Sequence, residues 1–248
     1  MIDTVLFDLD GTLLSMDQDE FIKAYFGLLA QFTAAQGWDQ RETMQVVGAG
    51  TKAMIKNDGS MTNEERFWQV FTEGTGRTRE SAEEIFLHFY KNDFEKLSSL
   101  SQRKEESAGV VRRMRSKGLK VVLATNPLFP RVATAARIRW AGLSAEDFDW
   151  ITTYENSRFS KPSLDYYREV LAAVGAEPQN CLMVGNDTTE DMCTAELGMQ
   201  VYLVTDHLID TQGRGEQAFR HGSLKELGEQ IDQLVEAAPF SPGASVLS

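Results

Sequence analysis

The chain has 248 residues and a formal net charge of −12 at pH 7. Such a surplus of acidic groups argues against strongly anionic partners, so we expect neither a nucleic-acid nor a membrane partner. Hydrophobic residues make up 42% of the chain and charged residues 25%, which is typical of a soluble globular protein with a sizeable core.

Targeting signals and cysteines favour a cytoplasmic protein. The first residues, 1–4, carry no basic group of the kind that opens a secretory signal. No apolar run approaches the roughly 20 residues that a membrane-spanning helix needs. The two cysteines, Cys181 and Cys193, fall in apolar strand-like and helix-like runs, so we expect both to be buried and reduced. We also expect a monomer or a weak dimer.

The first predicted element is a buried strand at residues 5–7, which ends at two carboxylates, Asp8 and Asp10. Residues two apart on a strand face the same side, and Gly11 allows a sharp turn directly after them. Two like charges held close together raise each other's pKa, so the pair needs a cation, a shared proton or a catalytic role. The alternative is an ordinary acidic turn at the end of a strand.

Residues 16–97 are predicted to form an inserted bundle of helices. Apolar residues recur there at helical spacing, and no strand pattern interrupts them. The segment 48–52 contains two glycines and is expected to lie as a loop between two of these helices. The predicted helices cover residues 17–36, 39 to 48–50, 62–73 and 78–97.

The remainder of the chain alternates between strands and helices. The strands are predicted at residues 119–124, 150–153, 181–184 and 201–204, the last being the final strand of the chain. The helices are predicted at residues 103–117, 130–141, 163–174, 188–197 and 223–236. This alternation predicts an α/β fold, a Rossmann-like three-layer α/β/α core with a parallel sheet, formed by residues 1–15 and 98–238. Residues 239–248, rich in Pro, Ser and Gly, are expected to form a flexible tail.

Polar residues follow several of these strands, and the carboxyl ends of parallel strands meet at one edge of a sheet. Each of these residues has an ordinary explanation, such as a helix cap for Thr125, a solvated side chain for Lys161 or an N-cap for Asp187. Their occurrence together at successive strand ends favours a shared site. In chain order they are Asp8, Asp10, Thr125, Asn126, Lys161, Asp187, Glu190 and Asp191.

Four short motifs make the chain resemble the haloacid dehalogenase-like (HAD) hydrolase superfamily over nearly its whole length. They are D-x-D-G-T, a strand that ends in Thr and Asn, Lys followed by Pro, and a G-D motif followed by acids, matched in turn by residues 8–12, 121–126, 161–162 and 185–191. Asn186 separates the glycine of the fourth motif from its first acid. The helical insert resembles the C1 cap of subfamily I, as in phosphoglycolate phosphatases and β-phosphoglucomutases.

The resemblance implies a phosphatase that acts on a small phosphorylated metabolite and depends on Mg²⁺. Asp8 would be the nucleophile that forms an aspartyl-phosphate. Asp10 would protonate the leaving alcohol and then deprotonate water. Thr125, Asn126 and Lys161 would hold the phosphoryl oxygens, with the lysine supplying the local positive charge.

The same resemblance implies the metal ligands. Mg²⁺ would be bound by the Asp8 carboxylate, the Asp10 backbone carbonyl and Asp187, with water completing its shell. The fourth motif is interrupted by Asn186, so more than one of its acids is a candidate for the ligand. Asp191 and Glu190 stay open as alternatives to Asp187.

The identity of the substrate stays open, and so do three rival functions. The segment 48–52 resembles the glycine-containing specificity loop of such caps, so Gly50 and Lys52 are candidate substrate-binding residues, although an ordinary connecting loop is the alternative. The rivals are a phosphomutase, a 2-haloacid dehalogenase and a non-catalytic binding or regulatory protein. Asp10 disfavours the dehalogenase, because that branch lacks the second acid and needs no metal. The complete set of acids and lysine argues against lost catalysis.

Overall fold

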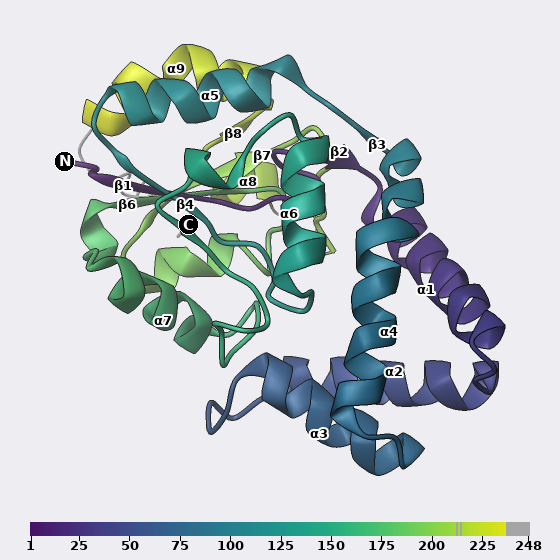
Figure 1. The fold of residues 1–248 in the computed structure, drawn as a ribbon. Coiled ribbons are helices and arrows are strands. Elements are labelled where there is room, and N and C mark those ends of the chain that lie inside the picture. The colour runs from purple at the N-terminus through teal and green to yellow at the C-terminus, as the bar shows by residue number, and fades with distance from the viewer. Residues whose placement is uncertain (212, 214, 237–248) are drawn as a thin grey trace.

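A computed structural model describes residues 1–211, 213 and 215–236 of the protein, and the tail predicted at 239–248 lies outside them. Figure 1 shows a sheet flanked by helices and joined on one side to a further group of helices. The main strands are β1 (Thr4–Phe7), β4 (Lys120–Leu123), β5 (Trp150–Ile151), β6 (Cys181–Gly185), β7 (Gln200–Val204) and β8 (His221–Gly222). Within the described residues they form one sheet in the order β5-β4-β1-β6-β7-β8, and every neighbouring pair is parallel.

Helices cover both faces of this sheet. They are α5 (Glu105–Ser116), α6 (Arg131–Trp140), α7 (Leu164–Val174), α8 (Gly215–Ala218) and α9 (Leu224–Glu236), with the 3₁₀ helices η2 (Ala145–Asp147), η3 (Pro178–Asn180) and η4 (Met192–Leu197). α5 and α9 lie side by side on one face, and α7 lies on the other (Figure 1). Val5 and Phe7 of β1 belong to the apolar cluster of α5 and α9, whereas Leu6 belongs to the cluster of α7. Alternate side chains of a central strand thus reach opposite faces, and the predicted three-layer α/β fold is confirmed.

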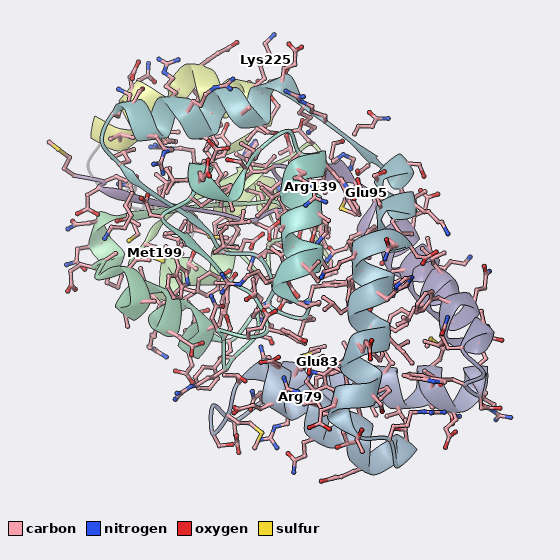
Figure 2. The ribbon with its side chains drawn as sticks, viewed as in Figure 1. Arg79, Glu83, Glu95, Arg139, Met199 and Lys225 are labelled. Atoms are coloured by element: carbon pink, nitrogen blue, oxygen red, sulfur yellow. The ribbon has the colours of Figure 1, made fainter. Side chains whose placement is uncertain are left out.

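The helices between β1 and α5 form a separate group, which we call the helical lobe. It consists of α1 (Gln18–Ala35), α2 (Gln40–Ile55), α3 (Asn63–Thr75), α4 (Arg79–Asn92) and the 3₁₀ helix η1 (Phe94–Leu100). Each α-helix of the lobe begins at a side chain that accepts the backbone N–H three residues later, and these caps are Asp17, Asp39, Thr62 and Thr78. On the surface of α4, Arg79 pairs with Glu83 (Figure 2).

Two short strands and a set of aromatic rings join the lobe to the sheet. β2 (Ser15–Met16) pairs antiparallel with β3 (Ser101–Gln102), so the chain enters and leaves the lobe side by side. Strands of two residues have no periodic pattern, and the sequence therefore did not indicate them. Phe94 of the lobe stacks on Trp140 of α6 with ring centroids 5.2 Å apart, and one apolar cluster runs through both parts.

Several predicted boundaries are wrong. The helix predicted at 188–197 is a turn followed by η4, which begins only at Met192. The helix predicted at 78–97 ends at Asp93, where η1 takes over. β7 is not the final strand, because the two-residue β8 follows it.

The segment 48–52, predicted to be a loop, lies inside α2. Gly50 is buried where α2 crosses α3, and a Cβ at this position would lie 2.7 Å from the ring of Phe67. At the same interface a Cβ on Gly74 would lie 2.9 Å from Val46. Glycine here lets two helices approach closely, so it does not mark a turn.

Two further predictions concern the cysteines and membrane-spanning helices. Cys181 and Cys193 are both free; the first is buried as predicted, whereas the second is partly exposed. Within the described residues, no helix combines the length and the apolar character that crossing a bilayer requires.

Candidate active site

Asp8 and Asp10 lie at the end of the central strand of the sheet. β1 runs between β4 and β6, and the backbone N–H of Asp8 donates to the carbonyl of Val184 at 2.9 Å. Gly11 has a φ of +86°, which turns the chain directly after Asp10. The sheet therefore holds Asp8 in place, and the turn keeps Asp10 at the same edge.

Lys161 is the cation predicted beside the acids, and its side chain is buried between two of them. Its Nζ donates to Asp8 Oδ1 and to Asp191 Oδ1, each at 2.7 Å. Burial alone would lower the pKa of Lys161, but the carboxylates of Asp191 and Asp8 outweigh it and hold the pKa well above its usual value. The lysine therefore stays charged. The other Asp8 oxygen, Oδ2, accepts from the hydroxyl of Thr12 at 3.2 Å.

Asp10 is held by an arginine that the sequence analysis did not single out. Arg137 of α6 is buried, and its Nη1 forms an ion pair with Asp10 Oδ2. The guanidinium also lies 4.5 Å from the ring centroid of Phe129. Burial raises the pKa of Asp10, the Arg137 charge opposes this rise, and the Asp8 charge adds to it. Asp10 Oδ1 is buried and has no hydrogen-bond partner among the described residues.

The acids after β6 have different partners. Asp191 accepts from Lys161 through Oδ1 and from the backbone N–H of Asp187 through Oδ2, at 3.1 Å. Burial raises the pKa of Asp191, while Lys161 opposes the rise. Asp187 instead accepts the backbone N–H groups of Thr189 and Glu190 on Oδ1, at 2.6 and 2.8 Å. These two bonds stabilise a tight turn at the position where the sequence predicted the beginning of a helix.

Thr125 and Asn126 follow β4 at the same edge. The carbonyl of Thr125 accepts from the hydroxyls of Thr152 and Tyr166, at 2.7 and 2.9 Å, and these bonds anchor the backbone there. Asn126 Nδ2 donates to both carboxylate oxygens of Glu190 at 3.2 Å. The two strand ends are thus connected through their side chains.

These residues surround a cavity of about 20 Å³, which we call the acidic cavity. A volume of this size holds about one water molecule. Lys161 does not line the acidic cavity itself, but it is hydrogen-bonded to two residues that do, Asp8 and Asp191. The lining residues are Asp8, Asp10, Gln18, Thr125, Asn126, Asn186, Asp187, Glu190 and Asp191.

The acidic cavity offers oxygen atoms to a cation. Asn126 Oδ1, like Asp10 Oδ1, is buried without a hydrogen-bond partner among the described residues. Oxygen atoms of carboxylates and amides are the ligands that Mg²⁺ prefers, together with water. Across residues 1–211, 213 and 215–236, however, no group of three or more Asp, Glu, His or Cys side chains is placed so that it could hold a metal ion. The cavity therefore offers the kind of donor atom that Mg²⁺ prefers, but its side chains are not arranged as a ready metal site.

Comparison with protein families decides the class of the protein. A family model described as haloacid dehalogenase-like hydrolase matches residues 2–196. The chain belongs to this family. It is therefore an enzyme, a hydrolase, and the resemblance seen in the four motifs is confirmed.

A curated relative matches part of this HAD-like hydrolase. The glyceraldehyde 3-phosphate phosphatase of Methanothermobacter thermautotrophicus is 31% identical over 90 residues, which are 36% of this chain and 39% of that protein. The hydrolase thus matches about two fifths of the relative's length.

Solved structures share the fold of the hydrolase at low sequence identity. A HAD phosphatase from Thermococcus onnurineus has a TM-score of 0.56 at 16% identity and covers 96% of this chain and 100% of its own. A 2-haloacid dehalogenase from Pseudomonas syringae has a TM-score of 0.62 at 18% identity, with coverage of 94% and 100%. A β-phosphoglucomutase from Clostridium difficile has a TM-score of 0.54 at 17% identity, with coverage of 95% and 97%. Because these proteins carry three different names, the shared fold does not select the reaction.

Two predicted site residues of the hydrolase lie away from the acidic cavity. Gly50 is buried between α2 and α3, and Lys52 is exposed on α2. The expected loop at these residues is wrong, because both lie inside α2. Neither lines the acidic cavity, and their role in substrate binding stays a prediction.

Three residues at the site of the hydrolase were missed by sequence reasoning. Arg137 had a signal, because it lies one turn after Ala133 on the apolar side of its helix, where a charge needs a partner. Asn186 was noted only as an interruption. Its Oδ1 accepts from Thr12 at 3.1 Å, and its Nδ2 donates to a backbone carbonyl after β7 at 2.6 Å. Gln18, in the first turn of α1, carried no signal.

Proposed function

We propose that this hydrolase is a Mg²⁺-dependent phosphatase that cleaves a small phosphorylated metabolite through an aspartyl-phosphate intermediate. One observation carries the proposal: a carboxylate held by a buried lysine lies in the same cavity as a second carboxyl group whose pKa is raised. The first is suited to attack, and the second to carry a proton. The relative named as a phosphatase adds weaker support.

In the first step, a carboxylate oxygen of Asp8 attacks phosphorus, and the bond from phosphorus to the leaving oxygen breaks. Lys161 orients Asp8 through Oδ1, and Oδ2, which accepts from the hydroxyl of Thr12, makes the attack. Asp10 gives its proton to the leaving oxygen, so the product leaves as a neutral alcohol. Because Arg137 binds Oδ2 of Asp10, the proton is carried on the unpartnered Oδ1.

In the second step, Asp10 is a carboxylate and acts as a base. It takes a proton from water while the water oxygen attacks the phosphorus of the aspartyl-phosphate. The bond from phosphorus to Asp8 breaks and releases inorganic phosphate. Asp8 returns as a carboxylate and Asp10 as an acid, so both groups are ready for the next turnover.

The residues that would hold Mg²⁺ are the Asp8 carboxylate, the Asp10 backbone carbonyl and the Asp187 side chain. Asp191 is the alternative, but both of its oxygens already have partners, Lys161 and a backbone N–H, which favours Asp187. When bound, the ion would offset the negative charge that a phosphoryl group brings to a cavity lined with acids.

Further parts of the proposal concern the surroundings of the site. We propose that the helical lobe, predicted from the sequence at residues 16–97, acts as a cap over the sheet edge. We also propose a cytoplasmic protein that is a monomer or a weak dimer. The free cysteines agree with a reducing compartment.

Hydrolysis of p-nitrophenyl phosphate tests the proposal. Activity is expected with Mg²⁺, and EDTA is expected to abolish it until Mg²⁺ is restored. Asp8→Asn should lose turnover with every phosphate ester, because an amide is neither charged nor nucleophilic. Asp19→Asn, an exposed acid on α1, is the matched control and should keep full activity.

The outcome also separates the rival activities. Full hydrolysis by Asp8→Asn or by a metal-stripped sample would refute the proposal. Chloride release from 2-chloropropionate would identify a dehalogenase, and transfer of the phosphoryl group to a sugar phosphate would identify a mutase.

A further inference from the structure

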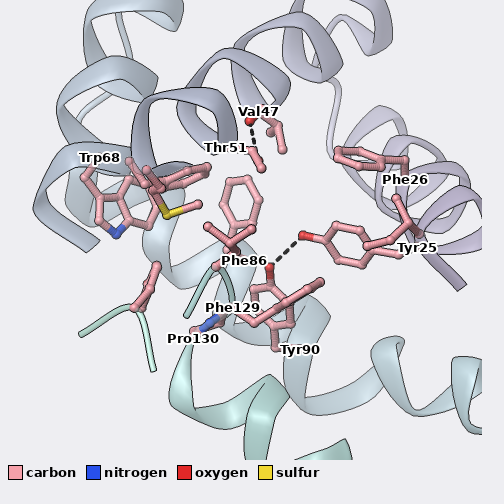
Figure 3. A pocket seen from close by; sticks show the side chains of 14 residues that line it. Tyr25, Phe26, Val47, Thr51, Trp68, Phe86, Tyr90, Phe129 and Pro130 are labelled. Atoms are coloured by element: carbon pink, nitrogen blue, oxygen red, sulfur yellow. Dashed lines mark hydrogen bonds between the residues drawn. The ribbon is translucent and has the colours of Figure 1, made fainter. Parts of the chain in front are cut away.

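A second cavity lies inside the helical lobe, against the loop that follows β4 (Figure 3). It has a volume of about 130 Å³, and we call it the apolar cavity. Its walls come from α1, α2, α3, α4, the loop at residues 128–130 and Tyr154, and aromatic rings form most of them. These rings belong to Tyr25, Phe26, Phe67, Trp68, Phe86, Tyr90, Phe129 and Tyr154.

The apolar cavity has few polar groups, and one of the residues that line it, Trp68, has a buried indole N–H without a hydrogen-bond partner among the described residues. The hydroxyl groups of Tyr25 and Tyr90 lie 2.7 Å apart, and the hydroxyl of Thr51 donates to the carbonyl of Val47 at 2.9 Å (Figure 3). Burial raises the pKa of Tyr25 to about 12 and that of Tyr90 well above its usual value, so both phenols stay neutral. None of the described residues that line this cavity is Asp, Glu, Lys, Arg or His. An uncharged apolar ligand suits such walls, because a hydroxylated ligand would lose its bonds to water there.

The loop after β4 shows that the apolar and acidic cavities are neighbours. Asn126 lines the acidic cavity, and Leu128 and Phe129 line the apolar one. Two residues of extended chain span at most about 7 Å. The same short loop therefore forms a wall of both cavities.

Helix α1 also connects the acidic cavity to the apolar cavity, and so does Arg137. Gln18 lines the acidic cavity, and Ile22 and Tyr25, four and seven residues later, line the apolar one. This spacing puts all three on one face of the helix, with a rise of about 6 Å from Gln18 to Ile22. Arg137 pairs with Asp10 of the acidic cavity while its guanidinium contacts the ring of Phe129.

We infer that the apolar cavity receives the leaving group of the substrate, which is a phosphate monoester of an uncharged apolar alcohol about the size of one aromatic ring. The inference rests on the proposed function and names its substrate class. A cavity of roughly 150 Å³ lined by aliphatic and aromatic groups binds benzene, so the volume found here suits a body of that size. Sugar and glycerol phosphates, whose leaving groups carry hydroxyls, are poorer ligands for these walls.

The test compares two primary alkyl esters, benzyl phosphate and glycerol 3-phosphate, with the Mg²⁺-supplied protein. Their leaving groups are both primary alcohols, so the intrinsic reactivity of the esters is similar. We expect kcat/KM for benzyl phosphate to be at least tenfold higher. Equal values, or a preference for glycerol 3-phosphate, would overturn the inference and leave the proposed phosphatase standing.

A matched pair of variants locates the effect in the cavity. Thr51→Phe places a ring in the apolar cavity from α2 and should reduce the benzyl-to-glycerol ratio at least tenfold. Gln45→Phe adds the same ring on the exposed side of the same helix and should keep the ratio. A Thr51→Phe protein that keeps the preference would contradict the assignment.

Binding of toluene tests the cavity without catalysis. Calorimetry should detect toluene binding to the unaltered protein and to Gln45→Phe but not to Thr51→Phe, and circular dichroism checks that each variant is folded. If esters are hydrolysed but toluene does not bind, the inference fails alone. If no ester is hydrolysed, the proposed function and the leaving-group assignment both fail, whether or not toluene binds.

Discussion

The acidic and the apolar cavities lie next to each other but are built in opposite ways. In the acidic cavity a single lysine binds two carboxylates at 2.7 Å each, and most polar atoms have a specific partner. None of the described residues that line the apolar cavity is charged, and the hydroxyl groups of Tyr25 and Tyr90 form a hydrogen bond with each other. Buried charges demand exact partners, whereas apolar walls demand mainly shape and volume. The first cavity is therefore suited to one chemistry, and the second to selection among substrates.

This contrast predicts that changes at the acidic cavity act on every substrate and on folding, whereas changes at the lobe act on relative rates or on stability alone. The largest effect is expected for Lys161→Met. It leaves Asp8 and Asp191 buried beside each other without a cation, which should reduce the free energy of unfolding by about 3–5 kcal/mol and abolish turnover.

Urea denaturation and phosphate release measure the two effects of Lys161→Met. Lys96→Met is the control, because Lys96 pairs with Asp93 at an exposed position and should contribute about 1 kcal/mol or less. A loss of stability at Lys161 no larger than that at Lys96 would contradict the account of the buried pair.

A smaller effect is expected for Arg137→Met, which removes a charge that lowers the pKa of Asp10. The pKa of Asp10 should therefore rise further. Because the first step needs Asp10 protonated, kcat/KM for an alkyl phosphate falls as pH rises through that pKa, and this limb should move to higher pH in the variant.

The control for Arg137→Met is Arg139→Met on the same helix. Arg139 is exposed and pairs with Glu95 of η1 (Figure 2). It should leave the pH profile unchanged. A profile of Arg137→Met that stays in place or moves to lower pH would show that the arginine does not act on Asp10.

The smallest effects are expected for two glycines of α2. Gly50→Ala should destabilise the protein by about 1–3 kcal/mol, because the new methyl group meets the ring of Phe67. Gly48→Ala meets no atom within 4 Å and should stabilise the helix by up to about 1 kcal/mol. Thermal or urea unfolding of both variants checks this, and stabilisation by both would mean that the helices are not in close contact at Gly50.

The sequence predicted the acidic cavity well, because its residues follow strands whose ends must meet. Asp8 and Thr125 come directly after an apolar run and Asp187 shortly after one, and the parallel sheet brings the ends of those runs together. The choice among Asp187, Glu190 and Asp191 as metal ligand could not be made from the sequence, because the positions of these acids depend on a turn that replaces the expected helix.

The lobe was predicted less well, for a different physical reason. The glycines of 48–52 look like a loop until the position of Phe67 on another helix is known. The apolar cavity combines side chains from four helices and two loops, and each of these side chains alone looks like ordinary core. No local pattern records a volume left between elements, so this cavity was visible only in three dimensions.

The division of roles between Asp8 and Asp10 is the central claim, and rapid mixing of Asp10→Asn with two substrates tests it most directly. A nitrophenolate leaves readily without a proton, so p-nitrophenyl phosphate should still phosphorylate Asp8 and give a burst of about one nitrophenolate per enzyme. A slow phase should follow, because the water that hydrolyses the intermediate has lost its base. With benzyl phosphate, whose leaving group needs the proton, the same variant should show no burst. Equal loss of the first turnover with both substrates would contradict proton transfer by Asp10.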